Sequence, residues 1–405
     1  MNRLILGLVR ETKNPPDKRV PLTPRQCRQL SDQYQNLKIV VQPSDDRCYS
    51  DQEYKRAGIT IMEDLSGCDL LAGVKEVKPD ALIEGKTYLF FSHTAKKQLH
   101  NRSLLQVLVK KGIRLIDYEF LTGDSGQRVV AFGKWAGIVG AYNGLRALGK
   151  RSGRFELPMA SHFRSLDELK TALEGLDAGK TRMVITGGGR VAGGAVEILK
   201  AAGIRQVEPE AYLARSFEGA VFTRLDPWHY TINRFGEQFD FDHFTANPHL
   251  YENSFFPYAR RSDMYFACHF WDPRSPMLLT RKELMGGKIP IRIIADISCD
   301  IGGPIASTIR TSTIADPFYG FDPVMDKESE PFLNNSITVM AVDNLPAELP
   351  REASNSFGDA LSEFVIPEIL KPGGSGMLQK ATITQGGRLG KEFLYLKDFL
   401  EGFIN

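Results

Sequence analysis

The stretch TRMVITGGGRVAGGAVEILKAAGI, residues 181–204, decides the fold class of this chain. An apolar run typical of a buried strand, residues 183–185, is followed at once by three glycines and then by a segment with helical periodicity. Strand, glycine turn and helix in this order begin the βαβ unit that binds dinucleotides, and residues 187–193 match a relaxed form of its fingerprint, GxGxxxG. The stretch therefore predicts a Rossmann-like nucleotide-binding lobe.

The glycines of this turn suit a pyrophosphate ligand. Gly187 and Gly189 permit a tight turn and a close approach of the backbone. The stretch that runs on to Gly193 opens a helix, whose N-terminus presents unpaired N–H groups to phosphate. We therefore expect these three glycines to bind the cofactor. A glycine-rich turn without a ligand is the alternative.

An acidic residue about 20 positions further on is expected to hold the adenosine ribose. The segment RQVEPEAY offers Glu208, with Glu210 as second choice. A carboxylate there would accept a hydrogen bond from the ribose 2′-hydroxyl and repel a 2′-phosphate, so Glu208 favours NAD over NADP. An exposed loop acid without a ligand is equally compatible with the sequence.

The rest of the chain predicts a second α/β lobe around this one. Short apolar runs alternate with amphipathic stretches over the first 130 residues, which argues for a largely parallel sheet. Because the glycine turn lies in the middle of the chain, we expect the nucleotide lobe to be inserted into a catalytic lobe, with a cleft between the two. The expected boundaries are 1–132 and 309–405 for the catalytic lobe and 133–308 for the nucleotide-binding lobe. A long helix over 132–151 is expected to link the lobes, and the aromatic segment 217–263 has no clear periodicity.

Composition excludes several classes of protein. The 405 residues carry a net charge of +2, so neither a nucleic-acid footprint nor a strongly acidic surface is indicated. No apolar run is long enough for a membrane span, and the N-terminus resembles a first strand, not a signal peptide. Five cysteines without CxxC spacing argue against a disulfide framework or a metal site. We expect a cytoplasmic protein that acts on small molecules without nucleic-acid or membrane partners; a homo-oligomer remains open.

Titratable side chains gather at the predicted ends of strands. They are Lys75, Glu76, His93, Lys96 and Glu119. The carboxyl ends of parallel strands meet at one edge of a sheet, where ligands bind. Partial burial and neighbouring charges can bring the pKa of a lysine towards neutrality, and histidines titrate near neutral pH. Such a pair suits proton transfer to and from a carbonyl, carbinolamine or imine, although each residue taken singly is equally compatible with a structural role.

Two arginines are candidate anion clamps. Arg19 follows the first predicted strand, and Arg128 precedes the expected link between the lobes. A guanidinium pairs bidentately with a carboxylate. For each arginine, an ordinary surface salt bridge is the alternative.

Several segments resemble the alanine dehydrogenase, transhydrogenase and saccharopine dehydrogenase superfamily. They span nearly the whole chain in order and are VRETKNPPDKRVPLTP, LAGVKEV, YLFFSHTAKKQ, RLIDYEFL, QRVVAFGKWAGIVGA, QVEPEAY, MYFACHFW, ADISCDIGGPI and VDNLPAELPREAS. Within the superfamily they are most similar to the lysine–2-oxoglutarate reductase region of aminoadipic semialdehyde synthases and then to the lysine-forming saccharopine dehydrogenases. The resemblance implies two Rossmann-like lobes and a proton-transfer pair.

The resemblance also implies roles for single residues. Lys75 matches the general base and His93 the general acid, and Glu76 and Glu119 match acidic neighbours that tune this pair. The residues that match holders of the substrate carboxylates are Arg19, Lys96, Glu119 and Arg128. The residues that match the cofactor site are Arg190 and Val191 at the pyrophosphate, Asp300 near the nicotinamide ribose, and Cys268.

The activity that the resemblance implies is the interconversion of saccharopine with L-lysine and 2-oxoglutarate by nicotinamide-dependent hydride transfer. The cofactor is expected to be NAD, with NADP as the alternative, because the related reductases of animals and plants are associated with NADPH and the fungal enzymes with NAD. Two other functions remain open. One is reductive amination of a small 2-oxo acid, as in alanine dehydrogenases, and the other is a non-catalytic nucleotide-binding regulatory protein.

Overall fold

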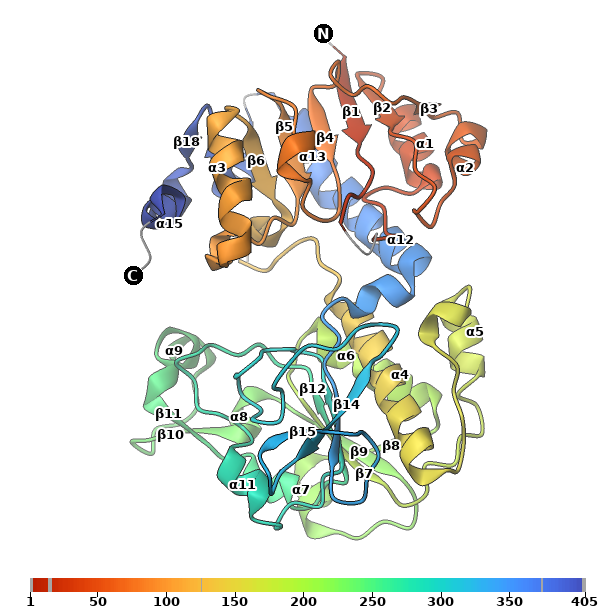
Figure 1. Cartoon of the computed structure of the whole chain (residues 1–405), viewed down its shortest axis with the longest axis vertical. Helices are drawn as coiled ribbons and strands as arrows, with labels where there is room; N and C mark the ends of the chain where they lie inside the picture. The colour runs from red at the N-terminus through yellow and green to blue at the C-terminus, as the bar shows by residue number, and fades with distance from the viewer. Residues whose placement is uncertain (1–2, 14–16, 125, 373, 403–405) are drawn as a thin grey trace. The chain divides into compact units, whose positions relative to one another are not determined.

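The computed structural model describes residues 3–13, 17–124, 126–372 and 374–402. The chain forms two compact units. Unit 1 consists of residues 1–131 and 350–405, and unit 2 consists of residues 132–349. The second unit is thus inserted into the first, as the position of the glycine turn predicts (Figure 1).

Unit 1 is built on an eight-stranded sheet with the order β18-β17-β6-β5-β4-β1-β2-β3. The six strands from β1 to β6 are parallel, whereas β17 and β18 are antiparallel to their neighbours. Their bounds are β1 Leu4–Leu8, β2 Leu37–Val41, β3 Thr60–Ile61, β4 Leu70–Ala72, β5 Thr87–Phe90, β6 Arg114–Asp117, β17 Thr382–Gln385 and β18 Arg388–Leu389. The predicted strands of the first 130 residues are confirmed within a few residues at their ends.

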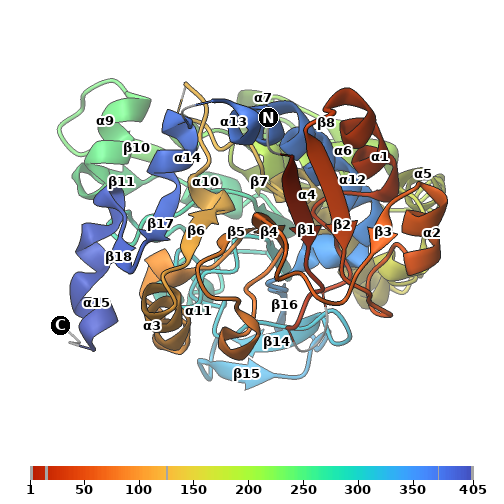
Figure 2. The same ribbon diagram turned by 90° about the horizontal axis from the view of Figure 1, so that it is seen from above.

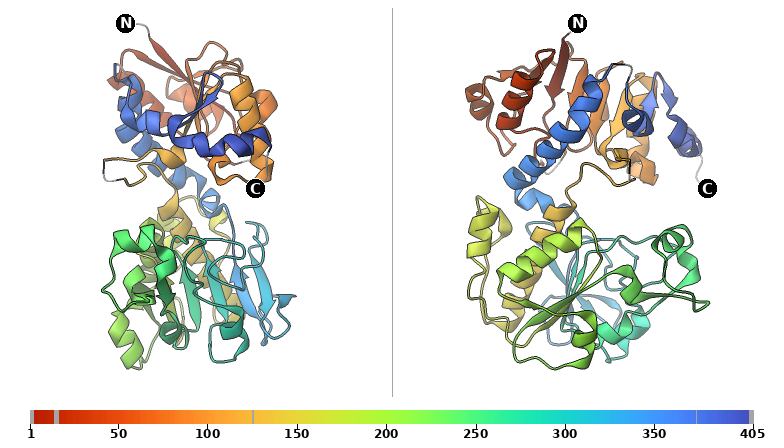
Figure 3. Two further views of the ribbon diagram at one scale, coloured as in Figure 1. Left: turned by 90° about the vertical axis from the view of Figure 1, so that its left-hand side faces the viewer. Right: turned by 180° about the vertical axis from the view of Figure 1, so that it is seen from behind.

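Helices cover both faces of this sheet. On one face, α3 (Arg102–Lys110) and α15 (Lys397–Glu401) contribute leucine and phenylalanine side chains to a core with β4, β5 and β6. On the other face lie α1 (Pro24–Gln33) and the C-terminal run α12 (Pro350–Ala360) and α13 (Ile366–Leu370) (Figure 3). Gln26 of α1 donates to the Asp359 carboxylate of α12 at 2.6 Å, which joins the two ends of the chain. The N-terminus of α1 is capped by Thr23, which forms a capping box with Gln26.

Unit 2 contains a second eight-stranded sheet with the order β15-β14-β16-β13-β12-β7-β9-β8. The strands β8, β9, β7, β12, β13 and β16 are parallel, and β14 and β15 extend the sheet in antiparallel fashion. Their bounds are β7 Arg182–Thr186, β8 Arg205–Gln206, β9 Val221–Leu225, β12 Met264–Ala267, β13 Ile293–Asp296, β14 Phe318–Asp322, β15 Lys327–Ser329 and β16 Ile337–Met340. The prediction of two Rossmann-like lobes with mostly parallel sheets is therefore confirmed.

One face of this second sheet is covered by α4 (Gly133–Ser152) and α6 (Arg190–Ala201), which lie against each other. The helices approach closely because glycines face the contact: a Cβ on Gly137 would overlap the carbonyl oxygen of Val191, and one on Gly194 would overlap that of Lys134. The other face carries a larger apolar core with α7 (Pro209–Ala214), α10 (Phe256–Ala259) and α11 (Arg281–Met285). A further short helix, α5 (Leu166–Thr171), contacts α6.

The segment between β9 and β12, for which periodicity gives no assignment, forms an excursion from the sheet. Its elements are α8 (Pro227–Tyr230), the antiparallel pair β10 (Thr231–Asn233) and β11 (Tyr251–Asn253), and α9 (Phe241–Ala246) (Figure 2). Aromatic rings hold it together: Tyr251 packs edge-on against Phe239 and Phe244, with ring centroids 5.6 and 5.0 Å apart. Side-chain contact, not a regular hydrophobic period, therefore determines its structure.

Two expectations about chain organisation differ from the structure. The return to the first unit comes at 349/350 and not at 308/309, because β16 pairs with β13 and β14 pairs with β16, which keeps residues 318–340 in the second sheet. The helix expected to link the lobes, α4, lies wholly in unit 2. Among the described residues, no helix combines the length and the apolar character that crossing a membrane requires.

Candidate functional site

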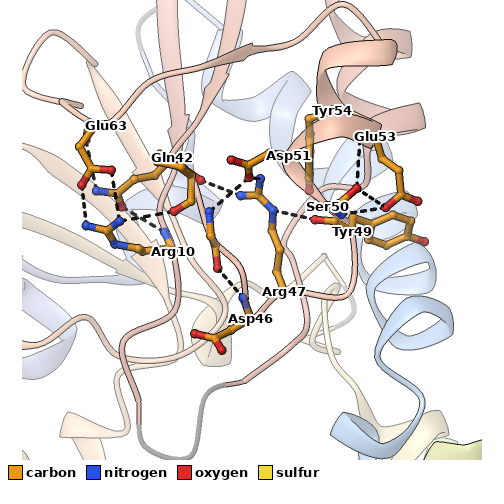
Figure 4. A network of polar contacts seen from close by, with 12 residues as sticks. Arg10, Gln42, Asp46, Arg47, Tyr49, Ser50, Asp51, Glu53, Tyr54 and Glu63 are labelled. Atoms are coloured by element: carbon orange, nitrogen blue, oxygen red, sulfur yellow. Dashed lines mark hydrogen bonds and ion pairs between the residues drawn. The ribbon is translucent and has the colours of Figure 1, made fainter.

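The loop after β1 contacts both neighbours of this strand. Arg10 reaches towards the β2 side, where its guanidinium binds Glu63 at 2.5 Å and its backbone N–H donates to Gln42 (Figure 4). Glu11 and Lys13 instead contact the segment that follows β4. The strand order reverses at β1, because β2 and β3 continue on one side of it and β4 to β6 on the other. Ligands bind beyond the carboxyl ends of strands at such a switch point.

Lys75 lies just beyond β4 at this switch point. Burial, together with the positive charges of Arg19 and Lys13, lowers the pKa of the Lys75 ammonium to about 8. The expected displacement of this pKa towards neutrality is confirmed in direction. A lysine in this state can gain and lose a proton near neutral pH.

Glu76 and His93 form an ion pair beside Lys75. The imidazole Nδ1 of His93 lies 3.6 Å from one carboxylate oxygen of Glu76, and Lys13 Nζ lies 3.6 Å from the other. Burial alone would raise the pKa of Glu76, but the neighbouring His93 imidazole, a backbone N–H and the charge of Lys13 outweigh it and hold that pKa at about 2. Glu76 therefore stays ionised and presents a negative charge to the His93 imidazole.

The backbone at His93 is held in an uncommon conformation. With a φ of 53°, His93 is in the left-handed region, which side chains other than glycine adopt rarely. The buried Asp117 carboxylate anchors the preceding residue, since it accepts the Ser92 N–H at 2.9 Å and the Ser92 hydroxyl at 2.5 Å. The ring of Phe91 stacks on the imidazole with centroids 6.5 Å apart. The ends of β5 and β6 thus fix the direction of His93 together.

The expected carboxylate-binding residues occupy different surroundings in unit 1. Arg19 is buried and forms a bidentate pair with Asp17, with N···O distances of 2.9 and 2.6 Å. Arg128 pairs with Glu119 at 3.2 Å, and Lys96 is exposed at the end of a single helical turn, Thr94–Lys96. Arg19 is near Lys75, since its charge affects that amine. Glu119 lines a different hollow of unit 1, together with residues near the C-terminus.

In unit 2 the glycine turn forms a cradle at the second switch point, where β7 lies between β9 and β12. Gly187 has a φ of 111°, and a Cβ there would lie 2.6 Å from the carbonyl oxygen of Cys268. A Cβ on Gly188 would overlap the Asp226 carboxylate. Gly189 is the N-cap of α6, and no side chain caps that end of the helix. A tight glycine backbone at an uncapped helix N-terminus fits the pyrophosphate of a dinucleotide.

A cavity of about 330 Å³ adjoins this cradle. It is bounded by the turn, by the end of β12 and by aromatic rings of the excursion between β9 and β12. Its lining includes Gly187–Val191, Tyr230, Phe241, Phe244 and Cys268–Trp271. The lining is mostly apolar and accommodates a flat heteroaromatic ring, which stacks well on aromatic side chains. Of the expected cofactor residues, Gly187, Gly189, Arg190, Val191 and Cys268 come together here.

Three expected cofactor residues lie elsewhere. Gly193 is exposed on α6 with open space around it, and Gly194 makes the close helix contact instead. Asp300 lies in the loop after β13, which the buried Asp296 carboxylate anchors through Ser298 Oγ at 2.6 Å. Glu208, expected at the adenosine ribose, is exposed beyond β8 at the sheet edge, because β9 lies between β8 and β7.

Asp226 is an acid that lies directly beside the glycine turn, since a Cβ on Gly188 would overlap its carboxylate. It directly follows β9, the strand that pairs with β7, and Gly187 N–H donates to Leu225 O at 2.8 Å in the same place. Arg224 holds both carboxylate oxygens of Asp226, at 2.7 and 2.9 Å. The spacing rule did not identify Arg224 and Asp226, because β9 follows β8 along the chain but lies directly beside β7 in the sheet. A sequence signal that could have identified Asp226 is the strand-like run VFTRL, residues 221–225, which it directly follows.

Comparisons with known proteins agree with this arrangement. Residues 7–139 match the family model "Alanine dehydrogenase/PNT, N-terminal domain". The chain is 31% identical to the mitochondrial alpha-aminoadipic semialdehyde synthase of Mus musculus over 98% of its own length and 48% of that protein. The chain therefore belongs to the superfamily that its motifs resemble. The chain spans about half the length of this and similar curated relatives.

More distant relatives match over most of their length. The saccharopine dehydrogenase [NAD(+), L-lysine-forming] of Neurospora crassa is 25% identical, with 82% of each chain covered. Among solved structures, an L-alanine dehydrogenase superimposes with a TM-score of 0.67 over 99% of this chain and 100% of that one, at 17% identity. The chain therefore shares the fold of that dehydrogenase.

Proposed function

We propose that this protein is a nicotinamide-dependent amino-acid dehydrogenase that interconverts saccharopine with L-lysine and 2-oxoglutarate. The observation that carries the proposal is the group of Lys75, Glu76 and His93 at the ends of β4 and β5, where burial lowers the pKa of Lys75 to about 8 and Glu76 pairs with His93. The similarity to aminoadipic semialdehyde synthases and saccharopine dehydrogenases supports the choice of substrate.

The acid–base steps follow from the charge states of these side chains. In the oxidative direction, neutral Lys75 accepts the proton of the saccharopine secondary amine. His93, which lies beside the Glu76 carboxylate, donates and recovers a proton as water adds to the imine and the carbinolamine breaks down. A bound nicotinamide supplies or accepts the hydride at the imine carbon.

Substrate carboxylates would meet basic side chains that already hold acids of the protein. Arg19 pairs with Asp17 and Arg128 with Glu119, so a substrate carboxylate would join or displace the protein partner of each arginine. Lys96 is exposed and adds a third positive charge after β5. These three basic groups would attract the several carboxylates of saccharopine.

The proposal predicts a pH profile. Lys75 accepts a proton only in its neutral form, and its pKa of about 8 lies below that of an ordinary lysine. We therefore expect kcat/KM for saccharopine oxidation to rise as the pH passes upward through about 8 and to level off above it. Steady-state rates of NADH formation between about pH 6 and 10 would measure this. A rate that falls over this range would contradict the role of Lys75 as base.

Cofactor choice is proposed to depend on Asp226, with NAD preferred. Asp226 lies beside the glycine cradle and would repel a 2′-phosphate, whereas its partner Arg224 would attract one. We expect Asp226→Asn to shift the ratio of NADPH to NADH dissociation constants towards NADPH by roughly tenfold. Nucleotide fluorescence titrations would measure both constants. Glu208→Gln should leave this ratio unchanged. A ratio that changes in Glu208→Gln and not in Asp226→Asn would show that Glu208, not Asp226, lies at the adenosine ribose.

A substrate screen tests the proposed function as a whole. NADH and NADPH oxidation is followed with lysine plus 2-oxoglutarate and with pyruvate plus ammonium. Turnover with the first pair alone supports the proposal. Turnover with only the second pair indicates an alanine-dehydrogenase-like enzyme, and nucleotide binding without turnover on any pair indicates a regulatory protein.

A further inference from the structure

A carboxylate from the end of β1 binds the backbone that carries Lys75. One oxygen of Glu11 accepts the Val74 N–H at 2.6 Å, and the other accepts the Lys75 N–H at 3.0 Å. The β1–β4 ladder has its last backbone bond just before this point, from Val9 N–H to Ala72 O at 2.9 Å. The Glu11 side chain therefore continues the pairing where the backbones no longer bond to each other.

This bridge spans the switch point of the first sheet. The β1–β4 register ends at Leu8 and Ala72, and beyond it side-chain hydrogen bonds join the segments that follow the two strands. Glu11 reaches from the β1 side to the β4 side. Its neighbour Thr12 adds a contact in the same direction, since its hydroxyl accepts the Lys78 N–H at 3.2 Å.

Ionisation of Glu11 makes both bonds stronger. A carboxylate accepts at each oxygen, whereas protonation turns one oxygen into a donor, which then faces an N–H group. Burial and the charge of Asp17 raise the pKa of Glu11 to about 8, and the two N–H groups and the charge of Arg19 act in the opposite direction. Tyr118, beyond β6, is a further titratable group whose ionisation the charge of Glu11 opposes.

We propose that Glu11 is a positioning residue that fixes the Val74–Lys75 backbone and thereby the place and proton affinity of the Lys75 amine. The expected effect on kcat rests on the proposed function, whereas the expected effect on the reactivity of the Lys75 amine does not. Without the two Glu11 hydrogen bonds, the backbone at Val74 and Lys75 is less restrained. The Lys75 amine then samples more exposed positions and is less often placed beside Glu76 and His93. Small displacements of a reacting group lower rates steeply.

The chemical test uses the rate at which Lys75 is acetylated by acetic anhydride in the full chain. Peptide mass spectrometry follows Lys75 as a function of pH, with the exposed Lys78 as internal standard. In Glu11→Gln, which retains a single acceptor oxygen, we expect the pH midpoint of Lys75 acetylation to move upward by about one unit because the amine becomes more exposed. Loss of the Glu11 charge alone would move the midpoint downward, and that outcome would contradict the inference. The matched control is Glu63→Gln, which removes a carboxylate from the exposed Arg10 pair; there the midpoint should not move.

The kinetic test compares the same variants. Glu11→Gln should lower kcat by about 10- to 100-fold with an unchanged NADH dissociation constant, since the nucleotide cradle lies in unit 2. If Glu11→Gln does not fold, as circular dichroism would show, Glu11→Asp provides the same comparison with a shorter carboxylate. A Lys75 midpoint equal to that of the wild type in the folded variant would overturn the inference. If Glu11→Gln alters the Lys75 midpoint but the wild-type protein does not act on saccharopine, the positioning role of Glu11 is supported and the proposed reaction is refuted.

Discussion

Replacing Lys75 with methionine should lower turnover in saccharopine oxidation by about 10²- to 10⁴-fold. Methionine retains the length and apolar stem of lysine but carries no group that accepts a proton. The pKa of about 8 at Lys75 indicates that the amine is half neutral near the working pH of many enzymes, so its loss removes the base from the reaction. Steady-state kinetics with NAD and saccharopine measure the effect.

The control for this substitution is Lys78→Met. Lys78 is exposed three residues further along the same loop, so the same chemical change there should alter kcat little. His93→Gln should cause a loss similar in size to that of Lys75→Met, and the double variant should lose much less than the product of both, because the two groups act in one proton pathway. Near-normal turnover in both single variants would contradict the assignment.

Replacing Gly137 with alanine should destabilise unit 2 by about 1–3 kcal/mol or more. A methyl group there would overlap the Val191 carbonyl oxygen, which belongs to the backbone of α6 and cannot move aside as a side chain would. The two helices must then separate, and the apolar contacts beneath them loosen. Urea unfolding followed by tryptophan fluorescence and circular dichroism would give the change in free energy of unfolding.

Gly193→Ala is the matched comparison, because it adds the same methyl group to α6 where nothing lies within 4 Å. Alanine is a better helix former than glycine, so this variant should be stabilised by up to about 1 kcal/mol. Equal effects of the two substitutions would show that helix propensity, not the close approach of α4 and α6, governs this region.

Local signals explain why much of the fold could be predicted. The cap of α1 at Thr23, the apolar runs that form β1, β2, β4, β5, β6 and β7, and the turn at Gly187 each depend on residues within one short window. Lys75 and His93 were expected near each other because the carboxyl ends of parallel strands share one edge, and β4 does pair with β5. Glu76, the carboxylate beside His93, directly follows Lys75 in the chain, so the same reasoning predicted its position.

Strand order could not be predicted in this way. The edge position of β8 moves Glu208 away from the glycine turn and brings Asp226 to it, although both acids follow strand-like runs. The later return of the chain to unit 1 has a similar cause, since β14 and β16 join the second sheet through backbone bonds to a strand far back in the chain. No spacing rule encodes such partners.

The sequence by itself therefore determined the class of the fold, the nucleotide turn and the proton-transfer candidates, because periodicity, caps and glycines act over a few residues. Tertiary structure alone decided which acid lies beside the turn, which aromatic rings of the excursion line the cavity, and that Glu11 holds the backbone of Lys75. The physical reason is that these relations depend on hydrogen bonds and contacts between segments tens of residues apart, whose geometry only the packed sheets define.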